Sequence, residues 1–149
     1  HGLIDLDVQG RGDTAADDHH LVEDVGICLG QAVRKALGEK KGICRYGSAV
    51  IPMDESLCRV AMDLSGRPCL VWEAKLGDAR IGEFDPDLFR EFFKSFCDHS
   101  GITLHVNLIY GTNGHHMAEA IFKAFARAFR EAIAIDDRTE GVPSTKGCL

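Results

Sequence analysis

A five-residue pattern occurs twice in this chain and constrains its fold more than any other feature. Four of the seven histidines lie in two segments of the form His-His-x-x-Glu. We call them the first and second cassettes, comprising His19, His20 and Glu23, and His115, His116 and Glu119. On a helix the first His and the Glu, four residues apart, project from one face and can bind one ion. The second His points about 100° away. The pattern therefore predicts two helices that present metal ligands in their first turns.

The same order of elements surrounds each cassette. Residues 4–8 and 102–110 alternate apolar and polar side chains, which is typical of half-buried strands. A turn containing glycine follows each, and then an amphipathic helix, one from Asp17 or Asp18 to about Leu37 and one ending near Ile135. Val22, Val25, Leu29, Val33 and Ala36 form the predicted apolar stripe of the earlier helix. An internal duplication explains this order, with repeats at about 1–76 and 77–135 of a single domain spanning 1–149.

Between the cassettes the sequence predicts three strands and one helix. The strands are expected around 48–51, 57–64 and 69–76, where apolar residues alternate or cluster. Asp85 and Pro86 are typical of a helix start, and this helix is expected to reach about Cys97. Residues 136–149 are expected to form a tail without regular structure.

Charge and cysteine usage narrow the class of protein. A net charge of −6 argues against nucleic acid or an anionic membrane as the main partner. No apolar run reaches the length of a membrane span. The six cysteines are scattered without a Cys-x-x-Cys pair, which is typical of reduced, packed thiols and indicates a cytoplasmic protein rather than a zinc finger.

The cassette side chains determine which chemistry is available. Imidazole and carboxylate together suit divalent Mn, Fe, Co, Ni or Zn. A single His-His pair at a helix start is commonly just a polar first turn, but two copies in matching contexts favour a metal site. His105 is either a further ligand or a solvated strand residue, and both readings stay open. His99, near a helix end, is more typical of a favourable C-terminal charge.

A second set of polar residues is scattered along the chain. Each one alone is typical of a surface charge. Together, and placed beside a metal site, they would suit a substrate that bears a phosphate. They are Arg45, Arg67, Lys123, Ser144 and Lys146.

Segments spread along the whole chain resemble, in the same order, the imidazoleglycerol-phosphate dehydratase family. The resemblance rests on Asp17-Asp18-His19-His20-Leu21-Val22-Glu23-Asp24, Arg45-Tyr46-Gly47, Pro52-Met53-Asp54-Glu55, Leu64-Ser65-Gly66-Arg67-Pro68, Gly111-Thr112-Asn113-Gly114-His115-His116-Met117-Ala118-Glu119, Phe122-Lys123-Ala124 and Pro143-Ser144-Thr145-Lys146-Gly147.

The resemblance implies a fold and a reaction. The fold is α+β, a duplicated strand and helix unit of the ribosomal protein S5 domain 2-like type, with helices packed between two mostly antiparallel sheets. The reaction is a step of L-histidine biosynthesis, the removal of water from imidazole glycerol phosphate to give imidazole acetol phosphate. Two Mn²⁺ ions per active site, sites at subunit interfaces and a homo-oligomer of 24 chains are implied as well.

The resemblance also implies roles for individual residues. One ion would be held by His19, Glu23 and His116, and the other by His115, Glu119 and His20. Glu119, with Glu23 as its counterpart, would act as the catalytic carboxylate. Glu91 stands at a position that is His in some members, so it is either a further metal ligand or an acidic residue of the helix surface. The phosphate-binding positions match Arg45, Arg67, Lys123, Ser144 and Lys146, so that 136–149 would be a substrate-binding tail.

One departure concerns the start of the chain. The family has an upstream Asp-His-Met motif that supplies a further metal ligand, and this sequence begins after it, so we expect an N-terminally incomplete domain. Two other functions compete with the dehydratase. One is a different metal-dependent enzyme acting on a phosphorylated small molecule, such as a hydrolase. The other is a non-catalytic metal-binding or assembly protein.

Overall fold

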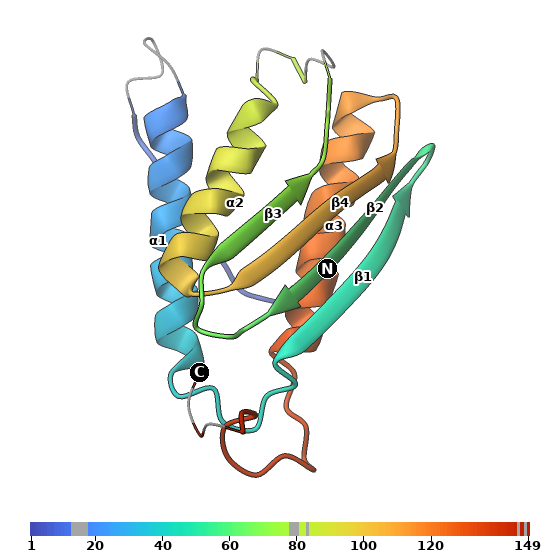
Figure 1. The fold of residues 1–149 in the computed structure, drawn as a ribbon. Helices are drawn as coiled ribbons and strands as arrows, with labels where there is room; N and C mark the ends of the chain where they lie inside the picture. The colour runs from blue at the N-terminus through green and yellow to red at the C-terminus, as the bar shows by residue number, and fades with distance from the viewer. Residues whose placement is uncertain (13–17, 78–80, 83, 146, 148) are drawn as a thin grey trace.

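The structure is a computed structural model that describes residues 1–12, 18–77, 81–82, 84–145, 147 and 149. Within these residues, helices lie against one face of a single sheet (Figure 1). This α+β architecture confirms the expected class. The elements are α1 (His19–Leu37), β1 (Tyr46–Met53), β2 (Ser56–Asp63), β3 (Cys69–Glu73), α2 (Asp87–Ser100), β4 (Thr103–Tyr110) and α3 (Gly114–Ala132).

The sheet has the strand order β1-β2-β4-β3. β1 and β2 form an antiparallel hairpin, and β2 pairs antiparallel with β4. β3 pairs parallel with β4, and α2 makes the crossover that a parallel pair requires. The resemblance implies two sheets, whereas the described residues form one.

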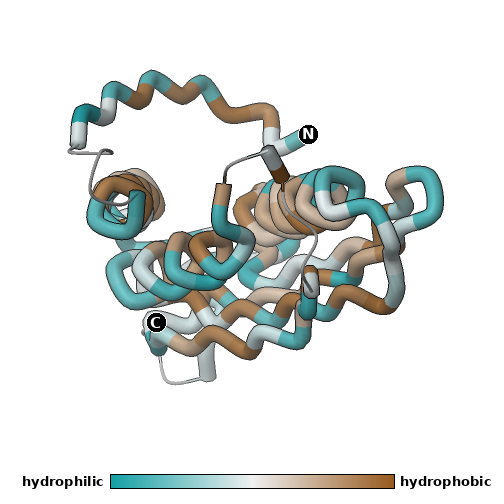
Figure 2. The backbone as a smooth tube through the Cα atoms, turned by 90° about the horizontal axis from the view of Figure 1, so that it is seen from above, coloured by the Kyte–Doolittle hydropathy of each residue, from teal (hydrophilic) through white to brown (hydrophobic). Residues whose placement is uncertain are grey.

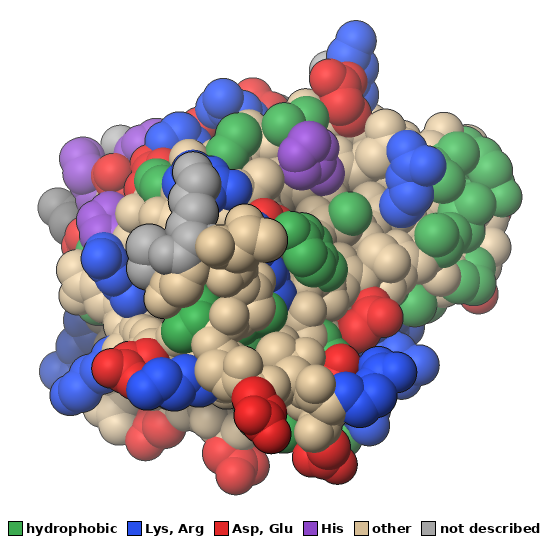
Figure 3. All heavy atoms as spheres, turned by 60° about the horizontal axis from the view of Figure 1, so that its bottom comes forward, with side chains coloured by type: hydrophobic (Ala, Val, Ile, Leu, Met, Phe, Trp, Pro, Cys, Tyr) green, Lys and Arg blue, Asp and Glu red, His purple; other side chains and the backbone are tan. Residues whose placement is uncertain are grey.

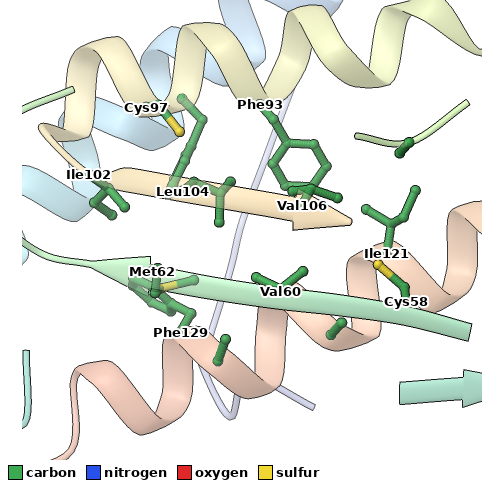
Figure 4. Close-up of a cluster of buried hydrophobic side chains, with 14 of the residues drawn as sticks. Cys58, Val60, Met62, Phe93, Cys97, Ile102, Leu104, Val106, Ile121 and Phe129 are labelled. Atoms are coloured by element: carbon green, nitrogen blue, oxygen red, sulfur yellow. The ribbon is translucent and has the colours of Figure 1, made fainter. Parts of the chain in front are cut away.

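The hydrophobic core lies between the sheet and the helices. Alternate residues of β2 and β4 are buried because strand side chains point to opposite faces in turn. Val60 and Leu104 are fully buried and face Phe93 of α2 and Ile121 of α3 (Figure 4). Cys58 and Cys97 lie in the same core, where burial raises the pKa of each thiol to about 12. Both therefore stay protonated at neutral pH.

α1 packs on α2 most closely at two glycines that lie among residues of the predicted apolar stripe. Gly26 and Gly30 are the buried residues of α1. A Cβ atom at Gly26 would lie 2.7 Å from the carbonyl oxygen of Phe92, and one at Gly30 would lie 2.6 Å from that of Phe96. The larger residues of the stripe flank this contact, and Ala36 is exposed. The stripe prediction is therefore confirmed for Leu29 and Val33, which pack against the core, and wrong for Ala36.

The predicted strand at residues 4–8 is wrong. This segment forms no strand, and Ile4 and Leu6 are 52% and 58% exposed. It runs along the side of the helices that faces away from the sheet (Figure 2). A strand needs a neighbour to complete its hydrogen bonds, and no described residue supplies one. The alternating pattern alone could not reveal this.

The other predicted elements agree with the structure within a few residues. α1 ends at Leu37 before Gly38, which has a positive φ of 50°, as expected of a glycine stop. The N-cap position is Asp18; Asp17, the other candidate, lies outside the described residues. None of the described helices is both long enough and apolar enough to cross a membrane.

Candidate functional site

The two cassettes lie at one end of the molecule but not together. α1 and α3 both begin at the end where the β1–β2 hairpin turns, and α2 stands between them (Figure 1). Among the described residues, no three His, Cys, Asp or Glu side chains form a group that could hold one metal ion. A single chain therefore presents the predicted ligands as two separate halves.

The backbone at the second cassette is ordered by an N-cap. The Asn113 side-chain oxygen accepts hydrogen bonds from the backbone N–H groups of His115, at 2.9 Å, and His116, at 3.2 Å. These are donors that the start of a helix otherwise leaves without partners. The cap holds both histidines at the first turn of α3, with their side chains directed out of the helix end.

Glu55, in the β1–β2 turn, connects the hairpin to this helix start. Its Oε1 accepts hydrogen bonds from the backbone N–H of Asn113 at 2.7 Å and of Thr112 at 3.1 Å. Its Oε2 accepts one from His116 Nδ1 at 2.6 Å. The bond to His116 is the largest cause that holds the pKa of Glu55 far below its usual range, and the same bond raises the pKa of His116.

The hydrogen bond to Glu55 leaves one ring nitrogen of His116 available to bind a metal ion. Because Nδ1 donates to Glu55, Nε2 is left to act as a metal ligand; it lies 3.7 Å from Asp54 Oδ2. Metal-binding histidines typically donate their other ring N–H to a carboxylate in this way. The second cassette thus fits a divalent ion in both donor type and ring orientation.

His115, Glu119 and Lys123 form a row along α3, at spacings of four residues. His115 Nε2 lies 3.3 Å from Glu119 Oε2, and Lys123 Nζ lies 2.6 Å from Glu119 Oε1. The hydrogen bond from Lys123 is the largest cause that lowers the pKa of Glu119. Glu119 is therefore a carboxylate at neutral pH, the form that either a base or a metal ligand requires.

The first cassette is built differently. The His19 and His20 rings meet edge to face at 5.9 Å between centroids, and both residues are exposed. Asp18 at the N-cap makes no side-chain capping bond. Glu23, one turn along, is partly exposed. Imidazole and carboxylate are present here too, so the donor types again suit a divalent ion.

The predicted phosphate-binding set is divided between the two ends of the sheet. Lys123 lies beside the second cassette, whereas Arg45 precedes β1 at the far end. Eight residues of extended strand span roughly 26 Å, so these two cations cannot contact one phosphate within a single chain. Within one chain these residues therefore do not form one basic cluster, and their role in binding phosphate stays a prediction.

At this far end of the sheet, Asp63 forms ion pairs with Arg45 and Arg67. Arg45 donates to it from Nε at 2.7 Å and from Nη2 at 3.1 Å, and Arg67 Nη2 lies 3.9 Å from Oδ2. Arg45 Nη1 also donates to the carbonyl of Pro143 at 2.7 Å, which brings the tail and its Ser144 to this end. Figure 3 views the molecule from this end and shows acidic and basic side chains interspersed. Lys146 lies outside the described residues.

The remaining candidates are spread over the surface. Glu91 on α2 is paired with Arg90 at 2.9 Å. His105 is exposed on the face of β4 opposite the core, which accords with a solvated strand residue. His99 Nδ1 lies 2.9 Å from the carbonyl oxygen of Ser95, in the last turn of α2.

Sequence reasoning missed Glu55, Asp63 and Asn113 as site residues. Glu55 is 61 residues from His116, and Asp63 is 18 residues from Arg45. No local spacing pattern reports such pairs. Asn113, which stands two residues before His115, carries the usual signal of an N-cap and could have been found.

Comparisons with known proteins agree with one another. The family model for imidazoleglycerol-phosphate dehydratase matches residues 1–129. Imidazoleglycerol-phosphate dehydratase of Syntrophus aciditrophicus is 65% identical over 150 residues, covering 100% of this chain and 76% of that protein. The same enzyme of Moorella thermoacetica is 57% identical over 149 residues, again covering 100% of this chain and 76% of that protein.

Solved structures are similar as well. The imidazoleglycerol-phosphate dehydratase of Staphylococcus aureus superposes with a TM-score of 0.79 at 45% identity, covering 87% of this chain and 72% of that one. IGPD from Pyrococcus furiosus gives a TM-score of 0.78 at 39% identity, covering 88% and 71% respectively. On the sequence match, the superposition and the two cassettes, the chain belongs to the imidazoleglycerol-phosphate dehydratase family.

Proposed function

We propose that this chain carries out the manganese-dependent dehydration of imidazole glycerol phosphate to imidazole acetol phosphate, in L-histidine biosynthesis. Besides family membership, one observation carries the proposal. The second cassette brings together a histidine turned by Glu55 to offer Nε2 and an ionised carboxylate held by Lys123. This pairs a metal ligand with a base at one helix start.

Two Mn²⁺ ions per active site would be held by the cassettes. His19, Glu23 and His116 would bind one ion, and His115, Glu119 and His20 the other. When bound, the ions would supply Lewis-acid stabilisation of the negative charge that develops on the substrate. Glu91 is proposed as a further ligand.

The cassettes require a second copy of the chain in this scheme. α2 separates α1 from α3 within one chain, so each ion would take its ligands from two chains at an interface. The division of the phosphate-binding set supports the same conclusion, since Arg45 and Lys123 lie at opposite ends. We therefore propose a homo-oligomer, a 24-mer by family resemblance.

The chain's own residues would perform the proton transfer. Glu119 takes the proton from the second carbon of the glycerol chain, which is bonded to the ring-bearing carbon, and Glu23 is its counterpart on the other cassette. The electron pair left on that carbon forms the double bond as the hydroxyl on the ring-bearing carbon departs with one proton as water. The resulting enol tautomerises to the ketone. Arg45, Arg67, Lys123, Ser144 and Lys146 would bind the phosphate and fix the ring relative to Glu119.

The first experiment measures conversion of imidazole glycerol phosphate by the manganese-loaded protein. Glu119→Gln should lower kcat by about 10³-fold, because a positioned general base is lost. Asp98→Asn is the matched control, since Asp98 forms the same kind of pair with Lys94 on α2, remote from the cassettes. Full activity of Glu119→Gln, or an inert wild-type protein with manganese bound, would overturn the proposal. Turnover of simple phosphoesters instead would indicate a hydrolase.

A complementation experiment tests the shared interface. Glu23→Gln and Glu119→Gln each damage a different cassette, so each should be nearly inactive alone. If a site takes its cassettes from two chains, denaturing and refolding the two variants together should restore about one quarter of the sites. Mixtures as inactive as the separate variants would contradict a shared site.

The proposed location is the cytoplasm. The five described cysteines are all free thiols, which supports a reducing compartment. Disulfides in protein isolated directly from cells would contradict it.

A further inference from the structure

We propose that Lys40, a buried lysine with no role in the chemistry above, is a positioning residue for the phosphate-binding end of the molecule. This inference rests on the proposed function. Lys40 is 7% exposed, and its Nζ donates a hydrogen bond of 2.9 Å to the carbonyl oxygen of Leu64. It thereby ties the loop after α1 to the end of β2, directly beside Asp63.

A chain of hydrogen bonds connects Lys40 to Arg45. The backbone N–H of Leu64, whose carbonyl Lys40 holds, donates to the carbonyl of Arg45 at 3.0 Å. The N–H of Arg45 donates in turn to the carbonyl of Ala132 at 2.9 Å. Lys40 therefore secures one side of the Arg45 backbone, and the end of α3 secures the other.

Arg45 needs this support because its backbone is strained. Its φ is +69°, in the left-handed region that residues other than glycine rarely adopt. Such strain persists only where the surroundings determine the conformation. In this conformation the guanidinium reaches both oxygens of Asp63 and the tail carbonyl of Pro143. Releasing the backbone would misplace the guanidinium.

The charges at this end point to an anionic ligand. Arg45, Arg67 and Lys40 lie around the carboxylate of Asp63. Burial is the largest cause that lowers the pKa of Lys40, whereas the charge of Asp63 raises it. A cation shielded from water stabilises nearby negative charge more strongly than an exposed one. Within this group three cations face one carboxylate, and the net positive charge suits a phosphate dianion.

The chain offers a matched control one residue away. Lys41 has the same charge, but its side chain is 64% exposed and pairs with Glu39 at the surface. An effect of charge alone on phosphate binding would be similar at both positions. An effect that acts through the Leu64 and Arg45 backbone would appear only when Lys40 is substituted.

The experiment compares Lys40→Met with Lys41→Met in the manganese-loaded protein. Binding of inorganic phosphate is measured by calorimetry, and kcat and KM are measured with imidazole glycerol phosphate. Lys40→Met should weaken phosphate binding about tenfold, raise KM by a similar factor and leave kcat within about twofold. Lys41→Met should match the wild-type protein. If Lys40→Met does not fold, Lys40→Gln replaces it. This variant keeps a donor for the carbonyl of Leu64, so we expect a smaller loss of phosphate affinity.

Three outcomes separate the alternatives. Unchanged phosphate affinity in both Lys40 variants would overturn the inference. A fall in kcat with KM unchanged would also overturn it, because that indicates a general loss of active protein. If phosphate binding depends on Lys40 but the wild-type protein does not dehydrate the substrate, the proposed function fails while the positioning role of Lys40 stands.

Discussion

The two cassettes share a sequence pattern and a helix length, yet differ in what surrounds them. α1 and α3 are both 19 residues long and begin at or one residue before their first histidine. The second cassette has a capping side chain, a carboxylate against His116 and the central strand β4 before it. The first has no capping side-chain bond, and the described residues before it, 1–12 and 18, form no strand. The same local sequence thus starts a helix in both places, but only the second start has a side-chain cap and a carboxylate bonded to its second histidine.

The difference has a consequence for the proposed active site. In the second cassette, the orientation of His116 is set within the chain by Glu55. In the first, the helix that carries the ligands packs closely on α2 at Gly26 and Gly30. We therefore expect the second cassette to be the pre-organised half of each metal site and the first to be the adjustable half. Four changes would break or sharpen this contrast.

The largest effect is expected from Glu55→Gln. With its oxygen facing Asn113, the Gln amide would donate to His116 Nδ1, and the ring proton would move to Nε2, where the metal should bind. Manganese affinity at one of the two ions should fall about 10- to 100-fold, measured by calorimetry. Asp5→Asn, a carboxylate remote from both cassettes, is the control. Unchanged affinity would show that Glu55 does not orient a ligand.

Gly30→Ala should affect the first cassette alone. Its Cβ would lie 2.6 Å from the carbonyl oxygen of Phe96, so α1 must move away from α2. We expect the free energy of unfolding to fall by about 1–3 kcal/mol, measured by urea denaturation. Gln31→Ala, at the exposed neighbouring position, is the control. An increase in stability, as helix propensity alone predicts for alanine over glycine, would show that the α1–α2 contact is not tight.

The two N-cap positions should respond unequally. Asn113→Ala removes two capping bonds and should cost about 1 kcal/mol of the free energy of unfolding. Asp18→Ala removes no side-chain capping bond and should have a smaller effect. The urea midpoints of the two variants measure the contrast directly. Equal losses would mean that the first cassette is capped as firmly as the second.

The smallest effect is a pH dependence of the metal-free protein. The lowered pKa of Glu55 adds stability above its ordinary value of 4.5, and this is lost as the pH falls through the folded-state pKa. The raised pKa of His116 adds stability that is complete below 6.5 and is lost as the pH rises through the folded-state pKa. The urea midpoint should therefore decline as the pH rises above 6.5, and less so in Glu55→Gln. If the urea midpoint changes equally with pH in the wild-type protein and in Glu55→Gln, the Glu55–His116 pair is not the cause.

Much of the local structure could be predicted from the sequence. Glycine, proline and asparagine mark element ends through backbone geometry, which is why the stop at Gly38 and the start of α2 after Pro86 agree with prediction. Alternation correctly predicted β2 and β4, which pair with neighbours in the sheet. The same alternation wrongly predicted a strand at residues 4–8, because the described residues supply no neighbouring strand for it. The bounds of the internal repeat stay a prediction.

By itself the sequence determined the two cassettes, the helices that carry them and the donor types that suit a divalent metal, because these depend on spacings within a few residues. Only the tertiary structure decided that Glu55 meets His116, that Lys40 supports Arg45, and that Lys123 and Arg45 lie at opposite ends. Those relations join residues far apart in the chain. They depend on strand order and helix packing, which no local spacing encodes.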